Sequence, residues 1–325
     1  MTSGKDTPKE TPFHEGELYM QNLMGVTERV AMFANRAVRS YLPNQHRMFF
    51  RQLPLILLGG LDEDGWPRAT MLAGEPGFAF SPDPSCFEIN AHVLTGDPFK
   101  SVLREGNPIG ALGLEFGTRR RNRFTAHVAN LSDGKIELNI DSSFGNCPRF
   151  IQTRDLEFVR DPRDAMFMPD IECFSSFDSS AHNVIATADT FFVATATAPG
   201  ENRIQYGADV SHRGGKSGFI RLDSDTELTI PDFSGNMHFN TVGNLLLNPR
   251  CSLFFPDFQT GDMLFLAGEM AIDLTSEEIP LFYGAERLMR FKLDHAIRLK
   301  AALPFRFTFG DYSPFSLMTG NWPDA

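Results

Sequence analysis

The sequence contains few cysteines and no long apolar run. Its four cysteines are Cys86, Cys147, Cys173 and Cys251. No two of them form a C-x-x-C pair, so they fit neither a disulfide scaffold nor a zinc site, and we expect reduced thiols and no bound metal. The longest apolar runs, 53–58 and 191–198, are far shorter than the roughly 18 residues that a membrane-spanning helix needs. Because the N-terminus also has no apolar signal segment, we expect a cytoplasmic protein without a membrane partner.

Positive charge is also scarce. Lys and Arg total 30 against 41 for Asp and Glu, which gives a formal net charge of -11 at pH 7. A negative surface does not attract phosphate backbones, so nucleic acid is not expected as a partner. Catalytic signatures are missing too, because no G-x-S-x-G, H-E-x-x-H or G-x-G-x-x-G motif occurs in a suitable context. The R-G-G-K-S stretch at 213–217 lacks the upstream glycine of a nucleoside triphosphate loop, since Val210 takes that position.

The sequence is rich in phenylalanine and in short apolar runs. Phe accounts for 31 residues against 5 Tyr and 2 Trp, and rings without a polar group are suited to burial. Residues 17–41, which Pro43 follows, and residues 276–288 show helical patterns. From residue 53 onward, the apolar runs are separated by Gly, Pro and Asp-Gly turns, which predicts antiparallel strands joined by hairpins. We therefore expect a mainly β (α+β) fold, and the length predicts two cores.

Two dipeptides recur at the same spacing along the chain. Gly77-Phe78 and Gly218-Phe219 are 141 residues apart, and so are Asn107-Pro108 and Asn248-Pro249. The expected elements between them follow the same order, which predicts an internal duplication with one antiparallel barrel in each copy. The expected organisation is a disordered tail (1–12), a first domain with an N-terminal helix (13–154), a linker with a helix near 179–187 (155–188) and a second domain with a C-terminal extension (189–325).

Two basic clusters interrupt the acidic background. The first, at an expected turn, consists of Arg119, Arg120, Arg121 and Arg123. The second, in an expected loop, consists of Ser211, His212, Arg213, Gly214, Gly215 and Lys216. Guanidinium groups bind phosphate through a planar fork of donors, and consecutive glycines let backbone amides converge on an anion. Together the clusters indicate a site for a phosphorylated ligand, and the alternative is that each is a solvated hairpin tip.

A third polar stretch stands directly before an expected helix of the second half. It contains Asp232, Ser234, Asn236, His238 and Asn240. Amides at a helix N-terminus can help to hold an anion. A turn with side-chain capping accounts for the same residues equally well.

Several short motifs, taken together, resemble a known family. In the second half they are D-V-S-H-R-G-G-x-x-G-F at 209–219, P-D-F-x-G-N at 231–236, L-L-N-P-R at 246–250 and G-D-x-L-x-x-x-G at 261–268. In the first half they are F-H-x-G-E at 13–17, L-A-G-x-P-G-F at 72–78, T-R-R-R-x-R at 118–123 and F-G-N-C-P at 144–148. This set resembles the flavin-binding split-barrel family typified by pyridoxamine 5′-phosphate oxidase, in its branch with two barrels per chain. The resemblance implies two tandem antiparallel split β-barrels with short flanking helices, and FMN bound between two barrels.

The resemblance also implies individual cofactor contacts. Arg203 occupies the place of a basic strand residue that approaches the FMN phosphate, and Asp232 lies where the next strand contacts the cofactor. Asn236 falls on the family's Ser-Arg-Lys phosphate turn, which here reads Gly-Asn-Met and lacks both cations. We infer that the two basic clusters replace them. The Arg-rich substrate signature of the oxidase is not recognisable near the C-terminus, so oxidation of pyridoxamine phosphate is not expected.

From these observations we expect an FMN-dependent oxidoreductase with an unidentified small-molecule substrate or electron donor, and we assign no catalytic residue. One alternative is a non-enzymatic flavin carrier or sensor, or a barrel that binds haem or a deazaflavin. A third possibility is an interaction scaffold that has lost its cofactor. In family members with a single barrel the site lies at a homodimer interface, whereas two barrels in one chain allow either an internal site or a homodimer.

Overall fold

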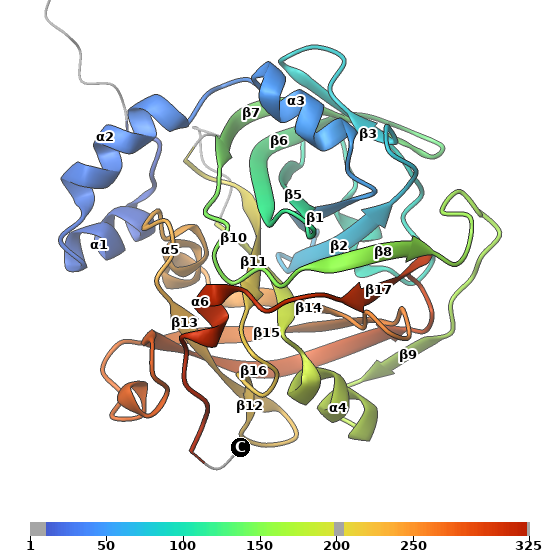
Figure 1. Ribbon diagram of the computed structural model, residues 1–325. Coiled ribbons are helices and arrows are strands. Elements are labelled where there is room, and N and C mark those ends of the chain that lie inside the picture. Colours follow the sequence, from blue (N-terminus) through green and yellow to red (C-terminus); the bar gives the residue numbers. More distant parts are fainter. Residues whose placement is uncertain (1–10, 198–204, 324–325) are drawn as a thin grey trace, which may run out of the picture.

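Two antiparallel sheets make up most of the molecule (Figure 1). The computed structural model describes residues 11–197 and 205–323. The first sheet has the order β2-β1-β5-β6-β7-β4-β3, with β1 (Leu55–Leu61), β2 (Pro67–Ala73), β3 (Ala79–Phe80), β4 (Cys86–Asn90), β5 (Pro108–Glu115), β6 (Arg120–Ser132) and β7 (Lys135–Gly145). The second has the order β11-β10-β14-β15-β16-β13-β12, with β10 (Thr190–Ala196), β11 (Ala208–Gly214), β12 (Arg221–Leu222), β13 (Glu227–Phe233), β14 (Arg250–Pro256), β15 (Met263–Asp273) and β16 (Ala285–Leu299). The expected mainly β fold with two antiparallel sheets is confirmed, and within the described residues neither sheet closes into a complete barrel.

The two sheets have the same topology. Replacing β1 to β7 by β10 to β16, with β10 for β1, β11 for β2 and so on, converts one strand order into the other. The Asn-Pro dipeptides also make equivalent contacts. Asn107 Nδ2 donates to the Leu61 carbonyl at 2.8 Å, and Asn248 Nδ2 donates to the Ala196 carbonyl at 3.1 Å, so each ties the start of one strand to the end of another. This is the arrangement that an internal duplication predicts.

The helices flank the sheets. The single helix expected over 17–41 is two helices, α1 (Glu15–Leu23) and α2 (Thr27–Ala37), because Gly25 between them has a φ of +64° that ends the first helix. Pro43 precedes α3 (Asn44–Arg51). The helix expected near 179–187 is confirmed as α4 (Ser179–Thr187), which Asp178 caps through the Ala181 amide. At equivalent places in the two halves lie the short 3₁₀ helix η1 (Pro98–Val102) and α5 (Asn240–Leu247).

Apolar side chains fill each half and the space between the halves. Phe50, Phe87 and Phe124 belong to the core of the first half. Phe191, Phe255 and Phe291 belong to the core of the second. A further cluster joins the halves and includes Leu57 and Leu112 from the first and Phe192 and Phe254 from the second. The backbones approach closely there, since a Cβ on Gly110 would lie 2.6 Å from the Ala208 carbonyl oxygen. The halves are therefore held in one arrangement by burial of apolar surface.

The linker and the C-terminal segment pack on the second half. β9 (Ile171–Phe174) pairs with β16, and β8 (Arg154–Phe158) pairs with β17 (Phe305–Phe309). The extension after β17 contains α6 (Pro314–Leu317), and Trp322 Nε1 donates to the Phe219 carbonyl at 2.9 Å. The helix expected over 276–288 is wrong. Only η2 (Ile279–Leu281) forms there, because Gly284, at a φ of +93°, turns the chain directly into β16. None of the described helices is both long and apolar enough to cross a membrane.

Candidate functional site

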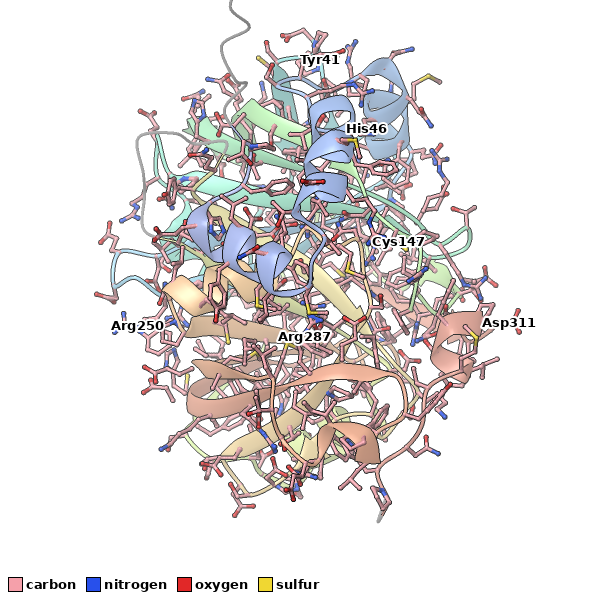
Figure 2. The ribbon with its side chains drawn as sticks, turned by 90° about the vertical axis from the view of Figure 1, so that its left-hand side faces the viewer. Tyr41, His46, Cys147, Arg250, Arg287 and Asp311 are labelled. Carbon is pink, nitrogen blue, oxygen red and sulfur yellow. The ribbon has the colours of Figure 1, made fainter. Side chains whose placement is uncertain are left out.

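A pocket lined by several arginines lies where the first half meets the second. From the first half it is lined by Arg121, Arg123 and Asn146. From the second half it is lined by the polar residues Ser211, His212, Arg213, Asp232, Asn236, Asn240, Thr241, Glu286 and Arg287. Figure 2 labels Arg287, at this pocket, and Cys147, whose carbonyl oxygen contacts Arg121. We call this site the arginine pocket. It brings together members of both basic clusters and of the third polar stretch, which are far apart in the sequence.

Most of each basic cluster lies on a strand and not in the expected turn or loop, the exceptions being Arg119, Gly215 and Lys216. The turn before β6 takes up only residues 116–119, with Arg119 at a φ of +60°, so Arg120, Arg121 and Arg123 belong to the strand. β11 likewise includes residues 208–214. Side chains alternate between the faces of a strand, so Arg121 and Arg123 share one face. Ser211 and Arg213 share a face of β11 for the same reason.

Two arginines of the first cluster point elsewhere. Arg119 Nε donates to the Ile151 carbonyl at 2.9 Å, and its Nη2 donates to the Asp311 and Tyr312 carbonyls, so this side chain holds the C-terminal segment. Arg120 lies with its guanidinium 5.0 Å from the centre of the Phe49 ring. Neither residue lines the arginine pocket. Arg203, the contact implied by the resemblance, lies outside the described residues.

The two glycines of the second cluster allow close packing. The Gly215 amide donates to the Asp189 carbonyl at 3.0 Å and is therefore not free to hold an anion. A Cβ on Gly214 would lie 2.1 Å from the Phe150 carbonyl oxygen. A Cβ on Gly215 would lie 2.4 Å from Cγ of Phe219. Gly214 lines only a smaller cavity next to the arginine pocket, beside Arg149.

Arg123 joins the two halves and has most of its donors occupied. Its Nη1 lies 3.0 Å from Asp209 Oδ2 and 3.2 Å from Asn240 Oδ1. Its Nη2 donates to the Val210 carbonyl at 2.6 Å and to Ser211 Oγ at 2.8 Å. The Arg123 side chain is 5% exposed. These contacts make Arg123 part of the pocket wall and leave little of it for a ligand.

Asp232 lies between two arginines. Arg213 Nη1 is 2.7 Å from Asp232 Oδ1, and Arg287 Nη1 is 3.1 Å from Asp232 Oδ2. Arg287 also contacts Glu286 and is 2% exposed. The sequence analysis missed Arg287 because it placed 276–288 in a helix. The pocket region thus holds four guanidinium groups against the three carboxylates of Asp209, Asp232 and Glu286.

Arg121 is the cation without a counter-charge. Its Nε donates to the Cys147 carbonyl at 2.5 Å. Among the described residues its two terminal nitrogens have no hydrogen-bond or ion-pair partner. Burial, with smaller contributions from the neighbouring charges of Arg123 and Arg213, lowers the pKa of Arg121 to about 10. Arg121 is therefore still charged at neutral pH, and its free donors face a pocket that already has an excess of positive charge.

His212 is the second unsatisfied group. The side chain is buried and neither ring nitrogen has a hydrogen-bond partner. Burial lowers the pKa of His212 well below its usual value, and Arg121, Arg154 and Arg213 act in the same direction. The ring is thus neutral at pH 7, with one donor and one acceptor. A buried polar group without a partner costs free energy, and a ligand with acceptor oxygens would provide a partner for the His212 N–H and for the free Arg121 donors.

Helix α5 begins at the same pocket, and α1 fixes its position. Glu17 accepts a hydrogen bond from Asn240 Nδ2, and the His14 ring lies 2.9 Å from Asn244 Oδ1. A Cβ on Gly16 would lie 2.2 Å from the Gly243 carbonyl oxygen, so the two helices cross in close contact. The F-H-x-G-E motif, to which the sequence analysis gave no catalytic role, therefore positions the N-terminus of α5, whose partial positive charge faces the pocket.

The donor set fits a phosphate group. A phosphate monoester presents several acceptor oxygens and about two negative charges. Arg121 offers free donors, His212 offers one, and the α5 N-terminus and Arg213 add positive charge. A phosphate group in the pocket would be held by these residues, because planar guanidinium forks match phosphate geometry. Among the described residues, no group of three or more His, Cys, Asp or Glu side chains is placed to hold a metal ion.

Comparison with known proteins gives weak likenesses only. No protein-family model and no curated protein matches this sequence. Among solved structures, a putative pyridoxamine 5′-phosphate oxidase from Lactobacillus delbrueckii is 10% identical, with 38% of this chain and 94% of that chain covered and a TM-score of 0.28. An FMN-binding protein from Syntrophomonas wolfei is 12% identical, with 35% and 80% covered and a TM-score of 0.26. The haem storage protein HutZ from Vibrio cholerae is 14% identical, with 38% and 95% covered and a TM-score of 0.26. Likenesses of this size assign neither a ligand nor an activity.

Proposed function

We propose that this chain binds FMN and holds the phosphate of the cofactor in the arginine pocket. The observation that carries the proposal is the pair of free terminal nitrogens on Arg121, a half-buried cation that has no counter-charge among the described residues. The neutral His212 ring beside it also lacks partners. Residues of both halves of one chain line the pocket, which supports a phosphate site within one chain.

The cofactor would supply redox chemistry, and we propose that the protein is an FMN-dependent oxidoreductase. The roles of its own residues follow from their positions. Arg121 and Arg213 would bind the phosphate, while Asp232, held between Arg213 and Arg287, fixes the direction of the Arg213 guanidinium. α1 would keep the start of α5 in place behind the anion.

Comparing FMN with riboflavin tests the phosphate site. Riboflavin lacks the phosphate, so the wild-type protein is expected to bind FMN at least about tenfold more tightly than riboflavin, since charge-assisted hydrogen bonds to charged groups contribute about 1.5–3 kcal/mol each. Arg121→Met should remove most of that preference while leaving riboflavin binding nearly unchanged. Arg120→Met is the matched control, because Arg120 is the next residue but lies over Phe49. If Arg121→Met keeps the full preference for FMN, or if the wild-type protein binds neither flavin, the phosphate site is refuted.

A second measurement concerns the activity. The FMN-loaded protein is mixed with NADH and with NADPH under anaerobic conditions, and the flavin absorbance is followed. Bleaching of the bound flavin, and its return when air is admitted, would support an oxidoreductase. A bound flavin that neither nucleotide reduces, in a protein that also does not accelerate reduction of added acceptors, would identify a flavin carrier and overturn the enzymatic part of the proposal.

A further inference from the structure

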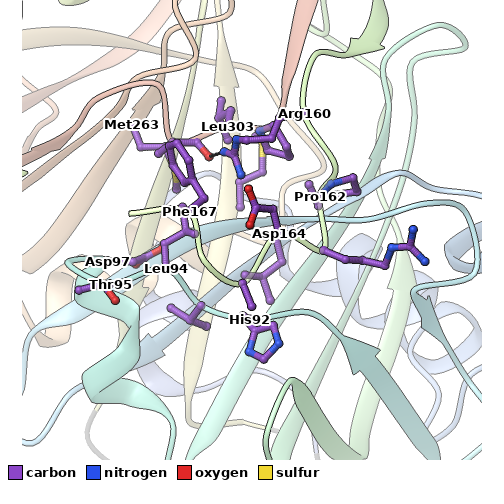
Figure 3. Close-up of a pocket in the computed structure, with 18 of the residues that line it drawn as sticks. His92, Leu94, Thr95, Asp97, Arg160, Pro162, Asp164, Phe167, Met263 and Leu303 are labelled. Carbon is purple, nitrogen blue, oxygen red and sulfur yellow. Dashed lines mark hydrogen bonds between the residues drawn. The ribbon is translucent and has the colours of Figure 1, made fainter. Parts of the chain in front are cut away.

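A second cavity lies between the two halves, beside β2 of the first half, at the place that corresponds to the arginine pocket. Figure 3 shows it, with labelled residues that include Leu94, Phe167, Met263 and Leu303. Its volume is about 200 Å³, against about 90 Å³ for the arginine pocket measured in the same way. We call it the first-half cavity.

Matching hydrogen bonds establish which residues correspond. The Gly74 amide donates to the Pro54 carbonyl at 3.0 Å, as the Gly215 amide donates to the Asp189 carbonyl at 3.0 Å. A Cβ on Gly74 would lie 2.4 Å from Cγ of Phe78, the same distance as from Gly215 to Cγ of Phe219. Gly74 and Gly215 are therefore equivalent positions. Counting back two residues on each strand places Leu72 where the second half has Arg213.

Other lining residues of the two cavities also correspond, but their side chains differ in chemical character. Counting back one residue further, Met71 stands in place of His212. On the far side, β15 contributes Met263 to the first-half cavity, whereas the equivalent strand β6 contributes Arg121 to the arginine pocket. The groups that would bind a phosphate are thus replaced by apolar side chains.

The charged groups around the first-half cavity are compensated or lie at its rim. Asp97 is buried, Thr70 Oγ1 donates to it at 2.5 Å, and burial raises its pKa to about 7. Arg160 donates to the Ala302 carbonyl at 2.8 Å, has its guanidinium 3.4 Å from the centre of the Phe167 ring and faces the charge of Asp164. Lys100 is exposed. Among the described residues, Nε and Nη1 of the half-buried Arg160 have no hydrogen-bond partner. Arg163 pairs with Asp161 and is exposed, as is His92.

We propose that the first-half cavity is a binding site for a small uncharged apolar molecule and that it does not take a second flavin phosphate. Met71, Leu72, Met263 and Leu303 would provide its apolar walls, and the segment 160–167 would cover it. A second flavin phosphate would be disfavoured because Met71 and Leu72 take the places that His212 and Arg213 have in the arginine pocket. The two halves would thus share one topology but bind different ligands, a phosphate in the arginine pocket and an apolar molecule in the first-half cavity. The statement that this cavity does not take a second flavin phosphate rests on the proposed FMN site.

The neutral fluorescent dye N-phenyl-1-naphthylamine tests the apolar site on the full chain. We expect one dye molecule to bind per chain with enhanced emission. Leu94→Asp, a change at a half-buried wall residue, should weaken dye binding by about tenfold or more, because it introduces a charge into apolar surroundings. Phe167→Ala, in the covering segment, should weaken it without adding a charge. Leu281→Asp is the control, because Leu281 is 50% exposed and lies in the other half. No dye binding, or equal binding by all variants, overturns the proposal.

A titration with FMN separates this proposal from the function proposed above. One FMN per chain, which leaves the dye bound, is the expected result. Two FMN per chain, or displacement of the dye by FMN, would show that the first-half cavity accepts the flavin and would overturn the proposal. If no FMN binds while the dye still binds in the Leu94-dependent way, the apolar site stands and the FMN site is refuted.

Discussion

Arg123 on β6 and Asp209 on β11 form a buried ion pair between the two halves, with Arg123 Nη1 3.0 Å from Asp209 Oδ2. Both residues come from segments that the sequence analysis linked to phosphate binding. The pair is surrounded by further hydrogen bonds from Arg123 to Val210, Ser211 and Asn240. Its geometry indicates a structural role for Arg123 and separates this arginine from Arg121, two residues earlier on the same strand face.

The first prediction concerns this ion pair. Arg123→Ala should lower the free energy of unfolding by about 3–5 kcal/mol, because it leaves the buried Asp209 carboxylate without its partner. Urea denaturation followed by circular dichroism measures the loss. The double variant Arg123→Ala/Asp209→Ala should recover part of it, since no unpaired charge remains. A single variant as stable as the wild-type protein would contradict a structural role.

The second prediction is that Arg121 costs stability. Its guanidinium is half-buried and has no counter-charge among the described residues, so Arg121→Met should unfold at the same or a higher urea concentration than the wild-type protein, with a gain of up to about 1 kcal/mol. The same variant should lose the preference for FMN. Residues held in an unfavourable state for binding commonly trade stability for function in this way. A clear loss of stability would mean that Arg121 holds the fold together as Arg123 does.

The third prediction concerns the contact between α1 and α5. A Cβ on Gly243 would lie 2.7 Å from the backbone nitrogen of Glu17, which cannot move aside without shifting α1. Gly243→Ala should therefore lower the free energy of unfolding by about 1–3 kcal/mol and weaken FMN binding, because the start of α5 is displaced. Gly117→Ala is the control, as a Cβ there would meet nothing within 4 Å and Gly117 has no positive φ. Equal effects of the two changes would contradict the role assigned to this contact.

The sequence predicted elements well where local signals agree. The capped helix of residues 179–187 has the expected bounds, and the short apolar runs between Gly and Asp-Gly turns form strands. The sequence-based prediction was wrong where a single glycine ends a helical pattern. Gly25 splits the expected first helix into two, and Gly284 turns 276–288 toward a strand. A positive φ at a single glycine is a tertiary feature that the helical periodicity of its neighbours does not reveal.

For the candidate site, the sequence indicated the basic clusters but could not distinguish their members. Arg119, Arg120, Arg121 and Arg123 differ in role because of strand alternation and of partners from distant segments. Arg287 carried no local signal at all, since it reaches the pocket through the pairing of β16 with β13. The positioning role of Glu17 depends on its hydrogen bond with Asn240, which is more than two hundred residues away in the sequence. The sequence thus indicated which residue types could form the site, but it did not predict which of them are buried or which partners they have.

The last prediction is a pH dependence set by Glu17. Burial raises the pKa of Glu17 to about 8, against an ordinary value of 4.5. Because the folded state holds this proton more tightly than the unfolded state, the contribution of Glu17 to stability is complete below about pH 4.5 and is lost as the pH rises to about 8. His14 and His238 act oppositely, since burial lowers the pKa of each to about 4 and their contribution is lost as the pH falls below about 6.5.

Glu17→Gln isolates the Glu17 contribution, because glutamine resembles the protonated acid but does not titrate. The variant and the wild-type protein should have similar free energies of unfolding near about pH 5, whereas near about pH 9 the variant should be the more stable of the two. Urea denaturation at both pH values measures the difference, and the histidine contributions cancel in the comparison. Because Glu17 holds Asn240 at the start of α5, FMN affinity of the wild-type protein should also fall over this interval more than that of the variant. Parallel stability curves for the two proteins would show that Glu17 is not protonated in the folded state.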